Sequence, residues 1–435
     1  MHDFILRIAI ARSFRRMALV LICGLLPVWA VPAAHAADTH DVVRATLDNG
    51  LRVILVRNTL APVVSTSVNY LVGADETPPG FPGTAHAQEH MMFRGSPGLS
   101  ADQLANIGSL MGGSFNAQTG QTVTQYYYTV PSEDLDVALH VEALRMRGVV
   151  DSEKDWDQER GAIEQEVAQD LSNPQYILYT RLRAEMFAGT SYAHDGLGTK
   201  PSFDKTTAAM LKSFHDRWYA PNNAILVVAG DFDPVATLAT VRKLFGTLPA
   251  RILPARVPLH FQPVKAQSFT LNSDLPYGME AIAMRMPGMD SPDYPALEVL
   301  ADVLNSERGA LYGLVPEGKA FSAGFSFDAL PGAAVASAEV TFPAGGDAAK
   351  LEREVRTLLA GIAKNGVPAD LVAAAKLQER SAAEFQKNSI EGLASAWSEA
   401  VALDGLDSPE EDLARIEQVT PADVNRVARR YLDLD

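Results

Sequence analysis

The sequence His86-Ala87-Gln88-Glu89-His90 decides what fold and chemistry to expect from this chain. Residues four apart share one face of a helix, so the imidazoles of His86 and His90 can reach a common point. Two neutral imidazoles with this spacing form half of a typical zinc site. Glu89 lies beside that point, where its carboxylate can take a proton from a metal-bound water. The alternative is a surface helix that carries two histidines and an acid without binding a metal.

Two histidines leave a zinc ion one protein ligand short of a catalytic site. A second predicted helix, over residues 153–173, is rich in acids. They are Glu153, Glu159, Glu164 and Glu166. Glu159 and Glu166 are seven residues apart, so they lie on one face of that helix, two turns from each other.

Residues 1–36 are typical of a secretory signal peptide. Four arginines precede a short apolar run over residues 17–30, and Ala34-His35-Ala36 is a small-x-small cleavage site. We therefore expect export across the inner membrane of a bacterium into the periplasm. The alternatives are an uncleaved anchor helix, which Pro27 disfavours, and a lipoprotein attached through Cys23.

The composition narrows the partners of the mature chain. The whole chain has a net charge of −16, and losing the four arginines and one aspartate of residues 1–36 lowers it to −19. An acidic body argues against nucleic acid and against an anionic membrane surface as partners. The single cysteine is lost with the signal peptide, so hydrophobic cores must hold the mature chain. No later apolar stretch is long enough for a stable membrane anchor.

The mature chain divides near its middle at four prolines between residues 249 and 263. We predict an N-terminal zinc-binding domain at 37–250, a linker at 251–266 and a homologous C-terminal domain at 267–435. In the first domain, Asp48-Asn49-Gly50 predicts a hairpin and Ser100 caps a helix. Strands are expected at 63–72, 114–130 (a pair) and 224–229, and helices at 132–149, 153–173 and 207–219.

The second domain shows a similar order of elements. A strand-like run at 267–285 precedes a helix at 293–306, two strands at 321–329 and 333–342, and helices at 347–364, 368–386 and 408–416. The last helix ends in Arg430-Tyr431, as the helix at 207–219 ends in Arg217-Trp218-Tyr219. We predict an α+β fold of two similar α/β-sandwich-like domains, each an antiparallel-rich sheet flanked by helices, related by internal duplication. Because only four residues follow Tyr431, we expect the last strand of the second copy to be missing or very short.

His-x-x-Glu-His followed by the helix Glu159-Arg160-Gly161-Ala162-Ile163-Glu164-Gln165-Glu166 resembles the pitrilysin/insulysin zinc peptidases, the inverzincins. The length is closest to their mitochondrial-processing-peptidase-like bacterial branch. Further similar stretches are His86 to Gly95, Gly113 to Ala117, Arg217 to Asn223 and Gly230-Asp231-Phe232.

The resemblance implies one Zn²⁺ per chain, held by His86, His90 and Glu166. It implies Glu89 as the general base and Glu159 as the acid that positions the site. It also implies a strand beside the metal that pairs with the substrate backbone. The residues of that strand are Ser114, Phe115, Asn116, Ala117 and Gln118.

One departure from the family bears on the partner. Family members carry an Arg and a Tyr, seven residues apart, that hold the scissile carbonyl, but Leu314 and Phe321 stand at these positions. Neither side chain can donate a hydrogen bond. We expect a heterodimer with a related chain that keeps the Arg/Tyr pair. In the alternative, Arg308 or Tyr312 substitutes locally and the chain works as a homodimer.

The predicted function is a zinc-dependent endopeptidase that cleaves short or unfolded peptides in the periplasm. Two other functions stay open: a non-catalytic assembly or interaction subunit, and a peptide-modifying subunit with the same chemistry and a different substrate.

Overall fold

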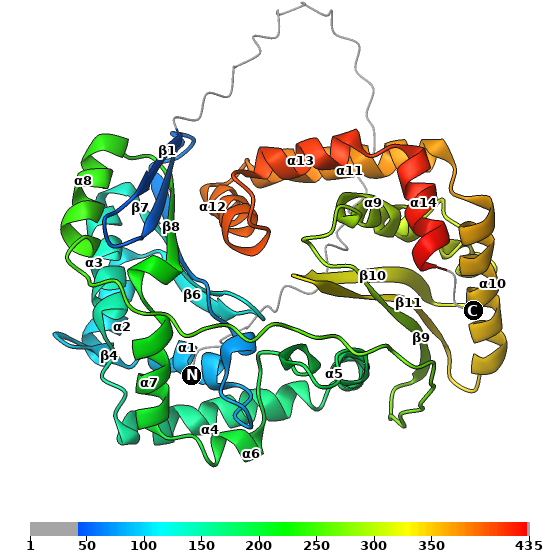
Figure 1. The fold of residues 1–435 in the computed structure, drawn as a ribbon, viewed down its shortest axis with the longest axis horizontal. Coiled ribbons are helices and arrows are strands. Elements are labelled where there is room, and N and C mark those ends of the chain that lie inside the picture. Colours follow the sequence, from blue (N-terminus) through cyan, green and yellow to red (C-terminus); the bar gives the residue numbers. More distant parts are fainter. Residues whose placement is uncertain (1–41, 433–435) are drawn as a thin grey trace, which may run out of the picture. The chain divides into compact units, whose positions relative to one another are not determined.

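A computed structural model of the chain describes residues 42–432, and the predicted signal peptide at 1–36 lies outside these residues. The first half of the described chain forms a six-stranded sheet with the order β1-β2-β8-β3-β7-β6 (Figure 1). All neighbouring strands are antiparallel except β2 and β8. The strands are β1 (Val42–Thr46), β2 (Arg52–Arg57), β3 (Val63–Tyr70), β6 (Ser114–Thr119), β7 (Thr124–Pro131) and β8 (Ala224–Gly230), beside a small ribbon of β4 (Gly95–Ser96) and β5 (Leu99–Ser100).

The turn between β1 and β2 is the hairpin predicted from Asp48-Asn49-Gly50. Gly50 has a φ of 88°, a left-handed conformation that glycine adopts without steric strain. The buried amide of Asn49 donates to the backbone oxygens of Phe245 (2.8 Å) and Leu248 (2.9 Å). These bonds satisfy carbonyls at the end of a helix and hold that helix against the turn.

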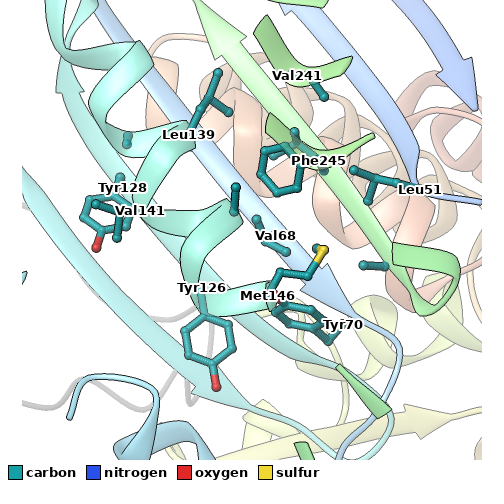
Figure 2. Packing of buried hydrophobic residues seen from close by; sticks show 14 of the residues in the cluster. Leu51, Val68, Tyr70, Tyr126, Tyr128, Leu139, Val141, Met146, Val241 and Phe245 are labelled. Atoms are coloured by element: carbon teal, nitrogen blue, oxygen red, sulfur yellow. The ribbon is translucent and has the colours of Figure 1, made fainter. Parts of the chain in front are cut away.

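Helices cover one face of this sheet and enclose the first hydrophobic core (Figure 2). Alternate residues of β7, such as Tyr126, Tyr128 and Val130, point into that core, as the two-residue period of a strand requires. The helices of this half are α1 (Thr84–Met91), α2 (Ala101–Met111), α3 (Leu135–Arg147), α4 (Glu153–Asp170), α5 (Pro174–Met186), α6 (Lys200–Phe203), α7 (Ala208–Trp218) and α8 (Pro234–Phe245). Short 3₁₀ turns occur at Ala74–Glu76, Ser132–Asp134, Ser191–Ala193 and Pro221–Asn223.

The second half forms a three-stranded antiparallel sheet with the order β10-β11-β9 and its own core. The strands are β9 (Tyr277–Met286), β10 (Ser322–Leu330) and β11 (Ala333–Pro343). The helices are α9 (Tyr294–Asn305), α10 (Ala348–Asn365), α11 (Ala369–Gln386), α12 (Ile390–Ser398), α13 (Pro409–Gln418) and α14 (Pro421–Tyr431), with a 3₁₀ turn at Tyr312–Leu314 and a π-helical turn at Glu399–Leu403.

The two halves share one repeated unit. In each, a strand leads to helical structure, then to a hairpin whose second strand lies in the middle, then to a long helix. The unit runs β3, α1, α2, β6, β7, α3 in the first half and β9, α9, β10, β11, α10 in the second. This confirms the predicted α+β fold with two similar units. Strands β1, β2 and β8 have no counterpart in the second sheet, and no strand follows α14 within residues 42–432.

Helix α12 covers the other face of the first sheet. Its residues Leu393, Ala394 and Trp397 pack with Ile54 of β2 and Val227 of β8 in a separate apolar cluster. Every residue of β8 is buried for this reason, because helices cover both faces of the strand.

Some predicted elements differ from the structure. The strand predicted at 267–285 begins only at Tyr277, and residues 249–275 form neither helix nor strand. Pro276, which lacks a backbone N–H for a strand ladder, precedes β9. The predictions do not include α5, α8 or α12. The predicted domain boundaries stay predictions.

Within residues 42–432, no single helix has both the length and the apolar character needed to cross a membrane. Helices α10 and α11, which meet at an angle of 101°, reach that length and composition only when taken together.

Candidate metal centre

Helix α1, which carries both histidines, begins at a close contact between two glycines. Gly83 has a φ of 89°, and Gly198 a φ of 85°. A Cβ on either residue would lie within 2.6 Å of the other's Cα, so only glycine fits at both positions. The contact brings the loop around Leu197 against the first turn of α1.

The donor atoms of three residues converge between α1 and α4. Nε2 of His86 lies 3.6 Å from Oε1 of Glu166, and Nε2 of His90 lies 3.6 Å from Oε2 of the same carboxylate. All donor atoms of the group lie within 4.8 Å of one another. Ligands about 2.0–2.1 Å from a tetrahedral zinc lie roughly 3.4 Å apart, so these two nitrogens and one carboxylate fit the ion. The described part of the chain holds no second such group.

The other nitrogen of each imidazole has a partner that fixes the ring. Nδ1 of His86 lies 3.0 Å from the backbone oxygen of Leu197, and Nδ1 of His90 lies 3.0 Å from Oε2 of Glu159. If each Nδ1 carries the proton and donates to its acceptor, each Nε2 keeps a free lone pair toward the metal. Arg94 pairs with the second oxygen of Glu159, which is only 5 % exposed. The structure thus places Glu159 where a positioning acid is expected.

Helix α4 presents Glu159 and Glu166 on the same face as its buried apolar residues, and this face lies against α1. Ser152 caps the helix by accepting a hydrogen bond from the backbone N–H of Asp155 (3.1 Å). Trp156, Ile163 and Val167 are buried against Ala87 and Met91 of α1. This packing turns the glutamates toward the histidines.

Glu166 is held in its charged form. Burial raises the pKa of this carboxyl group, but a hydrogen bond with His90 and the charges that His86 and His90 carry when protonated outweigh burial. The pKa of Glu166 is therefore lower than that of an ordinary glutamate, which suits a metal ligand.

The candidate base Glu89 is fixed by a residue far away in the sequence. Oγ1 of Thr119, the last residue of β6, donates a hydrogen bond of 2.6 Å to Oε2 of Glu89. Both side chains are partly buried. The bond sets the direction of the carboxylate and ties α1 to the strand proposed to bind substrate.

Strand β6 is an edge strand, paired only with β7. Ser114, Phe115, Asn116 and Gln118 are exposed, and Ala117 is buried toward the helices. The ring of Phe115 stacks on Tyr128 with centroids 5.5 Å apart. An exposed edge with free backbone groups can accept another extended chain.

The positions without the expected Arg/Tyr pair have ordinary surroundings. Leu314 is 3 % exposed within the second core, and Phe321 is 62 % exposed. Arg308 forms an ion pair with Asp370 of α11, and Tyr312 begins a 3₁₀ turn. The structure thus gives Arg308 a partner in the second half of the chain.

Three residues that contact the site were not predicted individually: Thr119, Arg94 and Leu197. Arg94 lies within the family-like stretch His86 to Gly95, which is a weak signal. Thr119 directly follows the predicted substrate strand. Leu197 contributes only a backbone oxygen, so no side-chain pattern could identify it.

Comparisons with known proteins agree with this geometry. Residues 52–200 match the family model "Insulinase (Peptidase family M16)", and residues 205–379 match "Peptidase M16 inactive domain". An uncharacterized zinc protease of Streptomyces coelicolor is 27 % identical over 92 % of this chain and 89 % of its own length.

Solved structures show the same fold. A protease from Helicobacter pylori matches with a TM-score of 0.83 at 23 % identity, over 91 % of this chain and 97 % of that chain. The periplasmic protease PqqL from Escherichia coli matches with a TM-score of 0.74 at 20 % identity, over 90 % of this chain but only 46 % of that chain.

Proposed function

The chain belongs to peptidase family M16, and from this premise we propose that it is an endopeptidase that cleaves short or unfolded peptides in the periplasm. Its relatives are named zinc proteases, which supports a metallopeptidase, and its donor set could hold the metal ion. The observation that carries the proposal is the convergence of His86, His90 and Glu166 beside Glu89. The Nδ1 atom of each histidine has a hydrogen-bond partner that holds the ring in place.

The residues divide the chemistry among them. His86, His90 and Glu166 would hold one zinc ion per chain, which when bound supplies the Lewis acidity that activates water and polarises a peptide carbonyl. Glu89 accepts the proton of the attacking water and delivers it to the leaving amine nitrogen. Glu159 holds the ring of His90 in the orientation this requires.

The substrate is an extended peptide that adds to the free edge of β6. Backbone hydrogen bonds along Ser114 to Gln118 would bind it with little dependence on side-chain sequence. Only a chain without its own secondary structure can pair in this way, which supports short or unfolded peptides as the substrate class.

A partner chain completes the site in this proposal. Leu314 and Phe321 cannot donate hydrogen bonds to the scissile carbonyl, and donors of that kind contribute about 3–4 kcal/mol in other hydrolases. A related chain with the Arg/Tyr pair would supply them in a heterodimer. A homodimer in which Arg308 or Tyr312 substitutes requires Arg308 to leave Asp370 or Tyr312 to act alone.

The periplasmic location is supported by the predicted signal peptide at residues 1–36. A fusion of these residues to a reporter enzyme that is active only after export would test it. An inactive fusion would contradict the location and leave the chemistry of the site unaffected.

The test of function is peptide hydrolysis by the purified mature chain, with zinc content determined on the same sample. Zinc with chelator-sensitive cleavage would show a self-sufficient peptidase. Zinc without cleavage would support the missing partner, and adding the related chain should then restore turnover. A chain that binds no zinc and gains no activity with a partner would favour the assembly-subunit alternative.

A further inference from the structure

Asp151 has an unusual backbone conformation for a non-glycine residue. Its φ of 42° is the only positive value at a non-glycine position within residues 42–432. Such a conformation costs on the order of 1 kcal/mol, although aspartate tolerates it better than most residues. Asp151 lies in the loop between α3 and α4, one residue before the cap Ser152. Strain of this kind persists only where the surroundings hold it.

The Asp151 side chain points inward to a second polar residue. Asp151 is 7 % exposed, and Gln88 of α1 is fully buried. Both polar neighbours of the Gln88 amide on this side are acceptors, so the amide is assigned with its nitrogen toward them. In this orientation the nitrogen donates to the Leu211 backbone oxygen (2.8 Å) and to Oδ2 of Asp151 (3.2 Å). Oδ1 of Asp151 has no hydrogen-bond partner, and burial raises the pKa of this carboxyl group to about 7.

Gln88 lies on the opposite face of α1 from the metal. Each residue turns a helix by about 100°, so the side chain of Gln88 lies about 200° from that of His86. Gln88 therefore takes no part in binding the ion. It instead joins the back of α1 to α7, through Leu211, and to the start of α4, through Asp151.

This bridge acts on the geometry between the ligands. His86 and His90 come from α1, and Glu166 comes from α4. On the metal side, His90 and Glu159 join the two helices by a hydrogen bond; away from the metal, their contacts are apolar and include the small side chain of Ala87. Apolar contacts are not directional, whereas a buried hydrogen bond fixes the relative position of the two elements it joins.

We propose that Gln88 and Asp151 are positioning residues that set the distance of the α1 histidines from Glu166 and so tune zinc affinity. This inference rests on the proposed function, because it needs the site to bind zinc. It assigns a role to a residue inside the five-residue motif that neither ligates nor moves protons. It also gives a reason for the strained residue before α4.

The test compares three variants. Asp151→Gly removes the acceptor and relieves the strain, so it should fold. Gln88→Leu removes the donor with little change in size. Asp151→Asn keeps an acceptor and tolerates the left-handed conformation. Zinc affinity is measured by competition with a fluorescent chelator, and site geometry by the visible absorption spectrum of the Co²⁺-substituted protein.

We expect Asp151→Gly and Gln88→Leu each to weaken zinc binding about tenfold and to change the Co²⁺ spectrum, because residues behind metal ligands typically affect affinity by about 10- to 100-fold. The double variant should lose no more than either single variant, because both break one bridge. The zinc affinity of Asp151→Asn should stay within about twofold of the wild-type value. This change is much smaller than the loss of about tenfold or more expected when such a residue is removed.

Asn49→Ala is the matched control for simple destabilisation. It removes a buried amide that joins the β1–β2 turn to the end of α8 and contacts neither α1 nor α4. It should lower Tm without changing zinc affinity. If the wild type binds zinc, and Asp151→Gly and Gln88→Leu have the same zinc affinity and Co²⁺ spectrum as the wild type, the proposed positioning role of Gln88 and Asp151 is wrong. The proposed function would then stand. A wild type that binds no zinc would overturn the proposed function and the bridge together.

Discussion

Helices α1 and α9 take corresponding places in the repeated unit, and each packs on the helix that follows the unit, α4 in the first half and α11 in the second. Both helix pairs hold partly buried carboxylates. In the first pair, Glu166 faces His86 and His90, and its pKa is lowered. In the second pair, burial and then the charge of Asp412 raise the pKa of Glu298 on α9 to about 9.

The difference teaches how one scaffold tolerates a buried acid in two ways. A carboxylate taken out of water must be neutralised by a nearby positive charge or by its own proton. The first half supplies imidazoles and Arg94, and has room for a metal ion. In the second half, the carboxyl group of Glu298 keeps its own proton at neutral pH, and a protonated carboxyl group is a poor ligand for a cation. The candidate metal centre thus depends on a few side chains, because the two units share their topology.

The largest expected effect tests the chemistry of the first pair. Glu89→Gln should lower kcat by about 10³-fold, because it removes the proton acceptor. Zinc content measured by atomic absorption should be unchanged. The control is Glu164→Gln, an α4 acid whose partner is Lys200 at the surface. Full activity in Glu89→Gln would remove this residue from the mechanism.

The next effect separates the two carboxylates of the comparison. Glu166→Gln should weaken zinc binding by at least about 100-fold. Removing a residue that contacts a metal ligand weakens binding by about 10- to 100-fold, and removing the ligand itself should cost more. Glu298→Gln should leave zinc affinity unchanged. Equal losses in the two variants, measured by chelator competition, would break the distinction between the two helix pairs.

A pH series sharpens the same comparison. The folded state holds the proton of Glu298 up to a pKa of about 9, against an ordinary 4.5. This carboxyl group therefore lowers stability progressively as pH rises from about 4.5 to 9. Glu298→Gln should stabilise the protein by up to about 5 kcal/mol at pH 8, since each pH unit between the two pKa values costs about 1.4 kcal/mol, and by almost nothing at pH 4.5. Asp274→Asn, an exposed control, should show no such trend in Tm, and an equal Tm shift at both pH values would refute the assignment.

The smallest expected effect concerns Thr119. Thr119→Val removes the hydroxyl that holds Glu89 and should lower kcat about tenfold, since hydrogen bonds to charged groups contribute about 1.5–3 kcal/mol. Thr119→Ser keeps the hydroxyl and should recover most of the activity. If valine and serine give the same kcat, the hydroxyl has no role in positioning the base.

Helical spacing predicted from the sequence that His86 lies beside His90 and that Glu159 lies in line with Glu166. The choice of Glu166 as the third candidate ligand came from the resemblance to the zinc peptidases. Thr119 and Asp151 could not be predicted, since folding brings them to α1 from other elements. Helices α5 and α8 were predictable in principle: each has a side-chain cap followed by proline, at Asn173-Pro174 and Asp233-Pro234.

The first ten residues of the strand predicted at 267–285, residues 267–276, show how far a local sequence pattern can predict a strand. Their composition favours a strand, but these residues are mostly exposed and pair with no other strand. Strand formation requires a partner for the backbone, which a single stretch of sequence does not reveal. Helix α12 shows the same limit, because the surface it covers belongs to the other half of the chain.

That placement of α12 dictates an order of events during synthesis. Ile54 and Trp397 meet in one cluster although about 340 residues separate them. A chain that emerges N-terminus first presents the apolar outer side of its first sheet, including Ile225 and Val227, long before the covering helix exists. The half that carries the His-x-x-Glu-His motif is therefore synthesised first, but its sheet is covered on both faces only after α12 has been synthesised. Until then its outer face is a natural surface for a chaperone to protect.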